Sequence, residues 1–115
     1  MKKVLVVDDE DLILWFLERA LRKKGYDVVI ARNISEACER LTKDCFDIVF
    51  TDLRMPGGNG TELLGRVGEI TQRSKVIVCS AYINPELCDV LRQKGIGVLR
   101  KPFRLDELEE VLKSA

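Results

Sequence analysis

The chain has 115 residues, of which 46% are hydrophobic and 33% charged, and its 19 basic and 19 acidic side chains cancel. This length suits one domain, and we expect residues 1–115 to form it. The balanced charge excludes strong attraction to nucleic acid or to an anionic membrane, and the apolar runs are too short to span a bilayer or to form a secretion signal. We therefore expect a cytoplasmic domain.

The four cysteines do not follow a metal-binding pattern. Cys38, Cys45, Cys79 and Cys88 lack the close paired spacing of zinc ligands, and the chain has no histidine to complete a mixed site. We expect free thiols that are buried or half-buried.

Apolar runs alternate along the chain with segments of helical period, which is typical of repeated strand–helix units. The expected strands are residues 4–7, 27–31, 48–51, 76–79 and 98–100. The expected helices are residues 11–24, 33–43 and 62–70, one that begins at Asn84-Pro85 and ends at Gly95, and residues 105–113. The sequence thus predicts five units of one strand and one helix.

Local signals set the faces of these helices. In the first, Leu12, Trp15, Phe16, Arg19 and Ala20 recur at helical spacing, and Gly25 is the stop signal. We expect Trp15 and Phe16 to lie in the core or at its edge. The second helix begins with a capping box of Asn33 and Glu36. The last is expected to turn Leu105, Leu108, Val111 and Leu112 inward.

Five short strand–helix units favour a doubly wound parallel sheet. Right-handed crossovers leave few arrangements, and the flavodoxin-like strand order 2-1-3-4-5 with five helices is the expected one. A closed barrel would need eight units. In the expected order the chain reverses direction between the first and third strands, which opens a crevice at their carboxyl ends.

Polar residues follow four of the expected strands directly. Asp8 and Asp9 follow the first strand, Asp52 the third, Ser80 the fourth and Lys101 the fifth. Because the strands are expected to be parallel, these side chains converge at one edge, and a cluster of carboxylates favours a hard cation. An alternative is that Asp8, Asp9 or Asp11 simply caps the helix that follows.

These motifs together resemble the receiver domains of two-component response regulators. The resemblance covers essentially the whole chain and rests on Val-Leu-Val-Val-Asp8-Asp9, Asp52-Leu-Arg-Met-Pro56 with Gly60, Ser80-Ala81, and Lys101-Pro102-Phe103. It implies a signalling domain that is phosphorylated by a sensor histidine kinase and acts on an output domain or a downstream protein. It does not imply an enzyme that turns over an external substrate.

The resemblance also assigns roles to individual residues. It implies that Asp52 accepts the phosphoryl group, that Lys101 stabilises the transferred group, and that Ser80 and the Ala81 backbone N–H bind phosphoryl oxygens. The cofactor implied is Mg²⁺, held by Asp8, Asp9 and Asp52 together with the backbone carbonyl of Arg54. The Lys101–Pro102 peptide bond is expected to be cis.

Signal output is expected through the face formed by the fourth helix, the fifth strand and the fifth helix, which is also the expected surface for weak homodimerisation. Val98 stands where most relatives carry an aromatic switch residue, so Tyr82 or a shift of the fourth helix is expected to transmit the change. Arg54 and Tyr82 also flank the approach of water to the phosphorylated Asp52, which predicts slow autodephosphorylation.

Three other functions remain open. One is a Mg²⁺-dependent phosphotransferase or phosphatase with an aspartyl-phosphate intermediate, although the core leaves little chain to shape a substrate pocket. The second is a degenerate receiver that acts by protein contacts without phosphorylation. The third is a flavodoxin-like electron carrier, which is disfavoured because Asp8, Asp9 and Glu10 would repel the phosphate of a flavin.

Overall fold

The computed structural model describes residues 2–52, 54–55, 58–59, 74–81 and 83–113, and only these are discussed below. The expected helix at 62–70 and Tyr82 lie outside the described residues. Within the described part, no helix is both long and apolar enough to cross a membrane.

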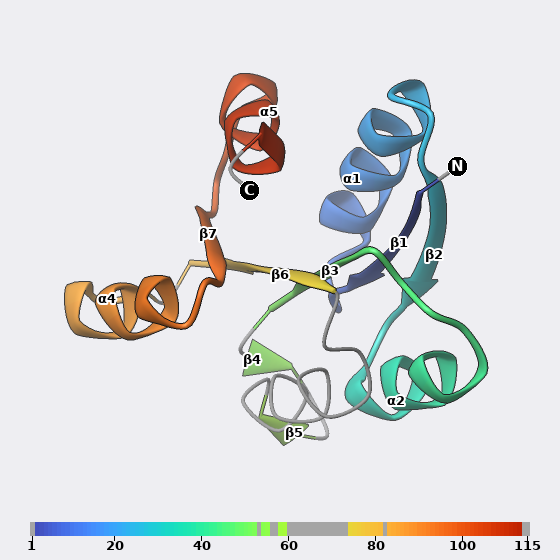
Figure 1. Ribbon diagram of the computed structural model, residues 1–115, viewed down its shortest axis with the longest axis horizontal. Coiled ribbons are helices and arrows are strands. Elements are labelled where there is room, and N and C mark those ends of the chain that lie inside the picture. The colour runs from blue at the N-terminus through green and yellow to red at the C-terminus, as the bar shows by residue number, and fades with distance from the viewer. Residues whose placement is uncertain (1, 53, 56–57, 60–73, 82, 114–115) are drawn as a thin grey trace.

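Five parallel strands form the central sheet in the order β2-β1-β3-β6-β7, which confirms the predicted flavodoxin-like arrangement (Figure 1). The strands are β1 (Lys3–Val7), β2 (Asp27–Ala31), β3 (Ile48–Thr51), β6 (Lys75–Ser80) and β7 (Gly97–Arg100). Just after β3, β4 (Arg54–Met55) and β5 (Gly58–Asn59) pair antiparallel in a separate two-stranded ladder, which the sequence did not predict.

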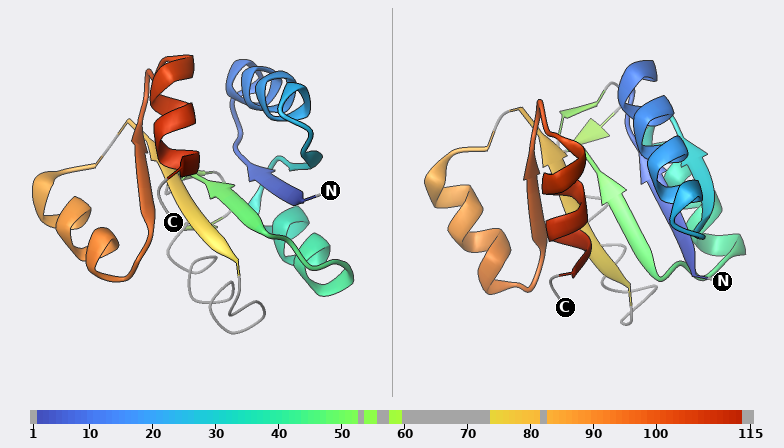
Figure 2. Two further views of the ribbon diagram at one scale, coloured as in Figure 1. Left: turned by 45° about the horizontal axis from the view of Figure 1, so that its top comes forward. Right: turned by 90° about the horizontal axis from the view of Figure 1, so that it is seen from above.

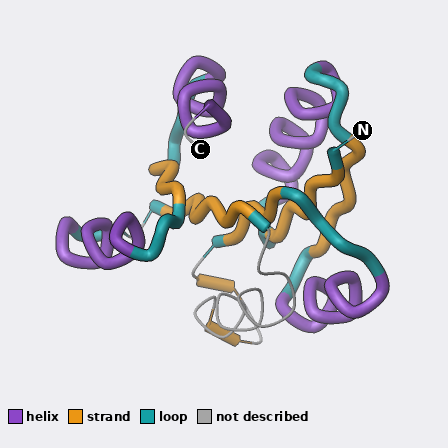
Figure 3. Tube along the Cα trace, viewed as in Figure 1, coloured by secondary structure: helices purple, strands orange, loops and turns teal. Residues whose placement is uncertain are grey.

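Helices cover both faces of the sheet (Figures 2 and 3). α1 (Asp11–Lys23) and α5 (Leu105–Lys113) lie on one face, α2 (Ile34–Lys43) lies on the other, and α4 (Pro85–Gln93) packs beside the edge strand β7. Successive side chains of β1 lie on opposite faces of the sheet. Val4 and Val6 pack against α1, while Leu5 and Val7 pack in a second cluster with α2. This period of two is expected for a strand buried on both sides.

The helix ends follow the predicted signals closely. The side chain of Asn33 accepts a hydrogen bond from the Glu36 N–H at 2.8 Å, but the Glu36 carboxylate accepts from the N–H of Arg32 at 3.0 Å rather than from that of Asn33. Asn84 caps α4 by accepting from the Leu87 N–H at 2.7 Å. Gly25 and Gly95 follow α1 and α4 with φ of 91° and 78°, a backbone region that favours glycine.

The predicted face of α1 was wrong for Leu12 and Trp15 and right for Phe16 and Ala20, which pack against the core. Leu14, Leu17 and Leu21 are the buried residues, whereas Leu12 and Trp15 are 80% and 57% exposed. Phe16 lies at the core edge as predicted, with its ring edge-on to Phe103 at 5.6 Å between centroids. The segment from Leu12 to Leu17 is apolar throughout, so two helical rows compete for burial, and contact with the sheet selects the row that starts at Leu14.

Two further expectations need correction. Leu105, the first residue of α5, is about half exposed, while Leu108 and Val111 are buried and Leu112 is partly buried, as predicted. All four cysteines are free, but Cys45 is exposed in the loop between α2 and β3.

Candidate functional site at the strand ends

Backbone hydrogen bonds extend the parallel ladders beyond the strands and thereby position the polar residues that follow them. The N–H of Asp8 donates to the carbonyl of Ala31 at 3.2 Å, and the N–H of Asp52 donates to that of Val7 at 3.2 Å. The N–H of Lys101 donates to the carbonyl of Ser80 at 3.1 Å. Asp8, Asp52, Ser80 and Lys101 therefore lie along one edge of the sheet, and the first three are buried residues.

Lys101 is the centre of this site. Its Nζ atom lies 2.7 Å from Asp8 Oδ2, 2.7 Å from Asp52 Oδ2 and 3.2 Å from Glu10 Oε1. The side chains of Lys101, Asp8 and Asp52 are almost completely excluded from solvent, whereas that of Glu10 is exposed. Two buried carboxylates thus share one buried ammonium, and a third carboxylate contacts it from the solvent-exposed side.

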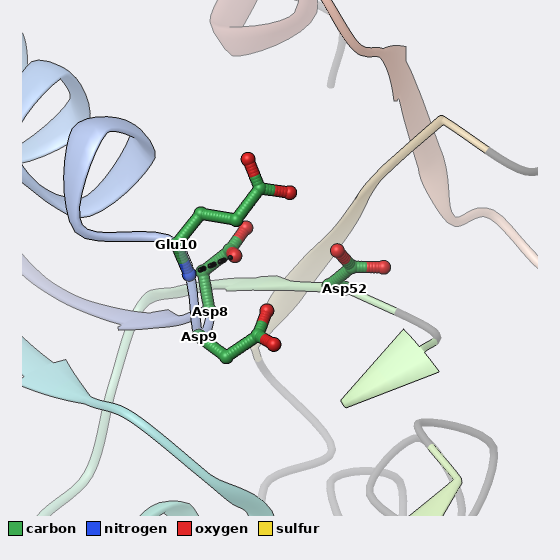
Figure 4. Close-up of side chains that lie close together, drawn as sticks. All are labelled: Asp8, Asp9, Glu10 and Asp52. Atoms are coloured by element: carbon green, nitrogen blue, oxygen red, sulfur yellow. Dashed lines mark hydrogen bonds between the residues drawn. The ribbon is translucent and has the colours of Figure 1, made fainter. Parts of the chain in front are cut away.

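Four acidic side chains form a cluster around this point. Asp8, Asp9, Glu10 and Asp52 each offer one carboxylate oxygen, and these atoms all lie within 4.8 Å of one another (Figure 4). The Glu10 N–H donates to Asp8 Oδ1 at 3.0 Å, which fixes the second oxygen of that carboxylate. Glu10 is the N-cap of α1, which has no side-chain cap hydrogen bond, so Asp8 and Asp9 are not helix caps.

Burial and charge act on the ionisable groups in opposite directions. Burial raises the pKa of Asp8 above its ordinary value, and this effect outweighs the hydrogen bond and charge of Lys101, which lower it. Burial by itself would lower the pKa of Lys101, but its hydrogen bonds to Asp52 and Asp8 raise that pKa above the ordinary value. Lys101 therefore carries a fixed positive charge at neutral pH.

The remaining predicted residues surround this cluster to different extents. The Lys101–Pro102 peptide bond is cis. Ala81 follows Ser80 in an exposed position, and Val98 is half-buried on β7. Arg54 begins β4, directly beyond the loop that carries Asp52.

Sequence reasoning placed Asp8, Asp9, Asp52, Ser80 and Lys101 at this edge but did not assign Glu10 to the site. Its position could have indicated this role: Glu10 lies between Asp9 and the first helical residue, Asp11, and so belongs to the short loop at the end of the strand.

The cluster has the donor set of a site for a hard divalent cation. All of its side-chain donors are carboxylate oxygens, the ligands that Mg²⁺ prefers, and Asp9 and Glu10 are exposed, so solvent can complete the coordination of an ion that usually retains several waters. The residues present therefore fit Mg²⁺.

A family model described as the response regulator receiver domain matches residues 4–113. The chain is 35% identical to sporulation initiation phosphotransferase F of Bacillus subtilis over 97% of this chain and 91% of that protein. It is 34% identical to the DNA-binding transcriptional regulator NtrC of Escherichia coli over 97% of this chain but only 24% of that longer protein. Among solved structures, the response regulator protein TrrA from Thermotoga maritima in complex with Mg²⁺-BeF has a TM-score of 0.84 and 33% identity, with 98% of this chain and 97% of that chain covered.

Proposed function

Because the chain belongs to the response regulator receiver domain family, a family of signalling domains, we propose that Asp52 is the residue that accepts a phosphoryl group from a sensor histidine kinase. The observation that carries this proposal is the 2.7 Å contact between Asp52 and the buried ammonium of Lys101 inside an acidic cluster. In this setting the aspartate lies at a strand end and its charge is partly balanced by the ammonium.

In the proposed reaction, a carboxylate oxygen of Asp52 forms a bond to phosphorus as the bond from phosphorus to the histidine nitrogen of the kinase breaks. The nitrogen retains the electron pair of that bond, and the product on this chain is an aspartyl phosphate. Lys101 stabilises the negative charge of the transferred group, the Ser80 hydroxyl donates to one phosphoryl oxygen, and the Ala81 N–H donates to another.

Asp8, Asp9 and Asp52, with the backbone carbonyl of Arg54, are the proposed ligands of Mg²⁺. When bound, the ion neutralises phosphoryl oxygens that would otherwise be repelled by the acidic cluster. TrrA, which is similar to this chain, was solved in complex with Mg²⁺-BeF.

We place the output surface on α4, β7 and α5. A groove of about 800 Å³ is lined by residues of these elements, among them Arg92 of α4, Val98 and Arg100 of β7, and Asp106, Glu107 and Glu110 of α5. Phosphorylation adds about two negative charges near Ser80, which ends β6 next to β7. A shift of Ser80 would be passed to this surface, where an output domain, a downstream protein or a second copy in a weak homodimer would respond.

Further features belong to the same proposal. The domain is proposed to act in the cytoplasm, where the kinase would present its phosphohistidine. Arg54 and Tyr82 are proposed to obstruct water at the aspartyl phosphate and so to slow its hydrolysis. Tyr82 is also proposed, with Val98 in place of an aromatic residue, to take part in the switch.

The test is intact mass after incubation with acetyl phosphate and Mg²⁺, in parallel for wild type, Asp52→Asn, and wild type with EDTA. We expect one hydroxylamine-labile phosphoryl adduct on metal-loaded wild type and none on the other two samples. No adduct on wild type would reject the proposal in favour of a degenerate receiver that acts by contacts. Repeated turnover of a generic phosphomonoester would instead indicate a phosphatase.

A further inference from the structure

Lys101 has a carboxylate partner that the proposed phosphoryl transfer does not use. An ammonium group has three N–H donors, and Asp8, Asp52 and Glu10 each place one oxygen within 3.2 Å of Lys101 Nζ. The resting site therefore supplies one acceptor for each donor. A phosphoryl oxygen that binds Lys101 must displace one of these three.

Solvent exposure decides which contact is lost most easily. The side chains of Asp8 and Asp52 are 2% and 8% exposed, so loss of the ammonium would remove a charge partner from a carboxylate that water hardly reaches. The side chain of Glu10 is 59% exposed, and water can replace the ammonium there at little cost in free energy. Of the three carboxylates, that of Glu10 can therefore give up its contact with the Lys101 ammonium most easily.

The backbone of Glu10 is held independently of its side chain. Its N–H donates to Asp8 Oδ1 at 3.0 Å, and its carboxylate takes no part in capping α1. The side chain can therefore swing between Lys101 and solvent without disturbing Asp8 or the start of the helix.

We propose that Glu10 is a positioning residue that occupies the third N–H of Lys101 in the resting state and gives it up to the incoming phosphoryl oxygen. The role rests on the proposed function, since it assumes phosphoryl transfer to Asp52. Glu10 then competes with an anionic donor for Lys101, and it shares the ammonium with the two buried carboxylates that a cation needs.

A thermodynamic cycle on Mg²⁺ affinity tests the action of Glu10 through Lys101. Calorimetric titration of the full chain with Mg²⁺ would compare wild type, Glu10→Gln, Lys101→Met and the double variant. With Lys101 present, we expect Glu10→Gln to weaken Mg²⁺ binding by about threefold or more, because the charge of the ammonium is then balanced by Asp8 and Asp52 alone. In the Lys101→Met background, the ratio of Mg²⁺ affinities with and without Glu10→Gln should approach one. Equal factors in the two backgrounds would overturn the proposal.

A donor titration gives a second readout with a matched control. We expect Glu10→Gln to lower several-fold the phosphoramidate concentration at which the rate of adduct formation is half-maximal. Asp11→Asn removes the same charge one residue away, from a side chain that pairs with Arg32 and is well exposed. It should leave that concentration unchanged, and an equal effect of the two variants would mean that only overall charge matters and would refute a role through Lys101.

Rejection of the proposed function and rejection of the role of Glu10 can be distinguished. If wild type takes no phosphoryl group, the proposed function is rejected, while the Mg²⁺ cycle still decides whether Glu10 acts through Lys101. If Lys101→Met does not fold, as circular dichroism would show, the comparison of Glu10→Gln with Asp11→Asn decides the role.

Discussion

Lys101 Nζ lies 2.7 Å from Asp52 Oδ2, although the two residues are 49 positions apart in the chain. The contact depends on the parallel order of β3, β6 and β7, because each strand brings its following residue to the same edge. The same ammonium also meets Asp8, so one lysine balances two buried carboxylates that arrive from different strands.

Loss of this lysine should destabilise the fold. Lys101→Met keeps most of the side-chain volume but removes the ammonium that the buried Asp8 and Asp52 share, and we expect a loss of about 3 kcal/mol in the free energy of unfolding at neutral pH. Urea denaturation without metal measures it. Lys43→Met is the control: both side chains of its pair with Glu39 are exposed, so the loss should be much smaller than that of Lys101→Met. Similar losses of stability for the two variants would contradict the view that Lys101 stabilises the fold by balancing Asp8 and Asp52.

The raised pKa of Asp8 predicts a particular dependence of stability on pH. The folded protein holds the Asp8 proton to a higher pH than the unfolded chain does, whose carboxyl titrates near 3.8. The contribution of Asp8 to stability is thus complete below that pH and is lost as pH rises through the folded pKa. Unfolding in EDTA at a series of pH values should show Asp8→Asn gaining stability relative to wild type as pH rises.

Glu39 provides a control of opposite sign for this experiment. The hydrogen bond and charge of Lys43 lower the pKa of Glu39, so its contribution is present above the ordinary value of 4.5 and is lost as pH falls. Glu39→Gln should therefore lose stability relative to wild type as pH rises, and only slightly because the pair is exposed. If the difference in free energy of unfolding between Asp8→Asn and wild type did not change with pH, burial would not raise the pKa of Asp8 in the folded protein.

The corrected face of α1 can be checked with two leucines of the same helix. Leu14 is buried against the sheet, so Leu14→Ala should lower the free energy of unfolding by about 2–5 kcal/mol. Leu12 is mostly exposed, so Leu12→Ala should change it by less than about 0.5 kcal/mol. Chemical denaturation of both variants measures the two values, and a larger loss for Leu12 would restore the face expected from the sequence.

Gly97 sets the spacing between β7 and α5. A Cβ atom built at this position would meet Val111 Cγ2 at 3.1 Å and Ile77 Cγ1 at 3.2 Å, both closer than ordinary contact. We expect Gly97→Ala to destabilise the protein by about 1–3 kcal/mol. The measurement is denaturant unfolding of Gly97→Ala, Val111→Ala and the double variant. Because Val111→Ala removes the clashing methyl group, the double variant should lose less than the sum of the single losses; simple additivity would reject this contact.

Local patterns were enough to predict most of the elements. The ranges of β2, β3 and α5 agree with prediction to the residue, because apolar runs, cap residues and glycines are signals within a few positions of one another. The convergence of Asp8, Asp52 and Lys101 was also predictable, since any parallel sheet of this order aligns its strand ends. Their roles in phosphoryl transfer stay predictions until the adduct is measured.

Hydrophobic periodicity and turn chemistry are local properties, so they were sufficient to predict a parallel α/β domain with acids, a hydroxyl and a lysine at its strand ends. Which row of α1 is buried depends on tertiary contacts, since two apolar rows satisfy the same helical period and the position of the sheet selects one. The tertiary structure also brought Glu10 to Lys101 across 91 positions. That contact depends on where two loops end after folding, and no local pattern encodes it.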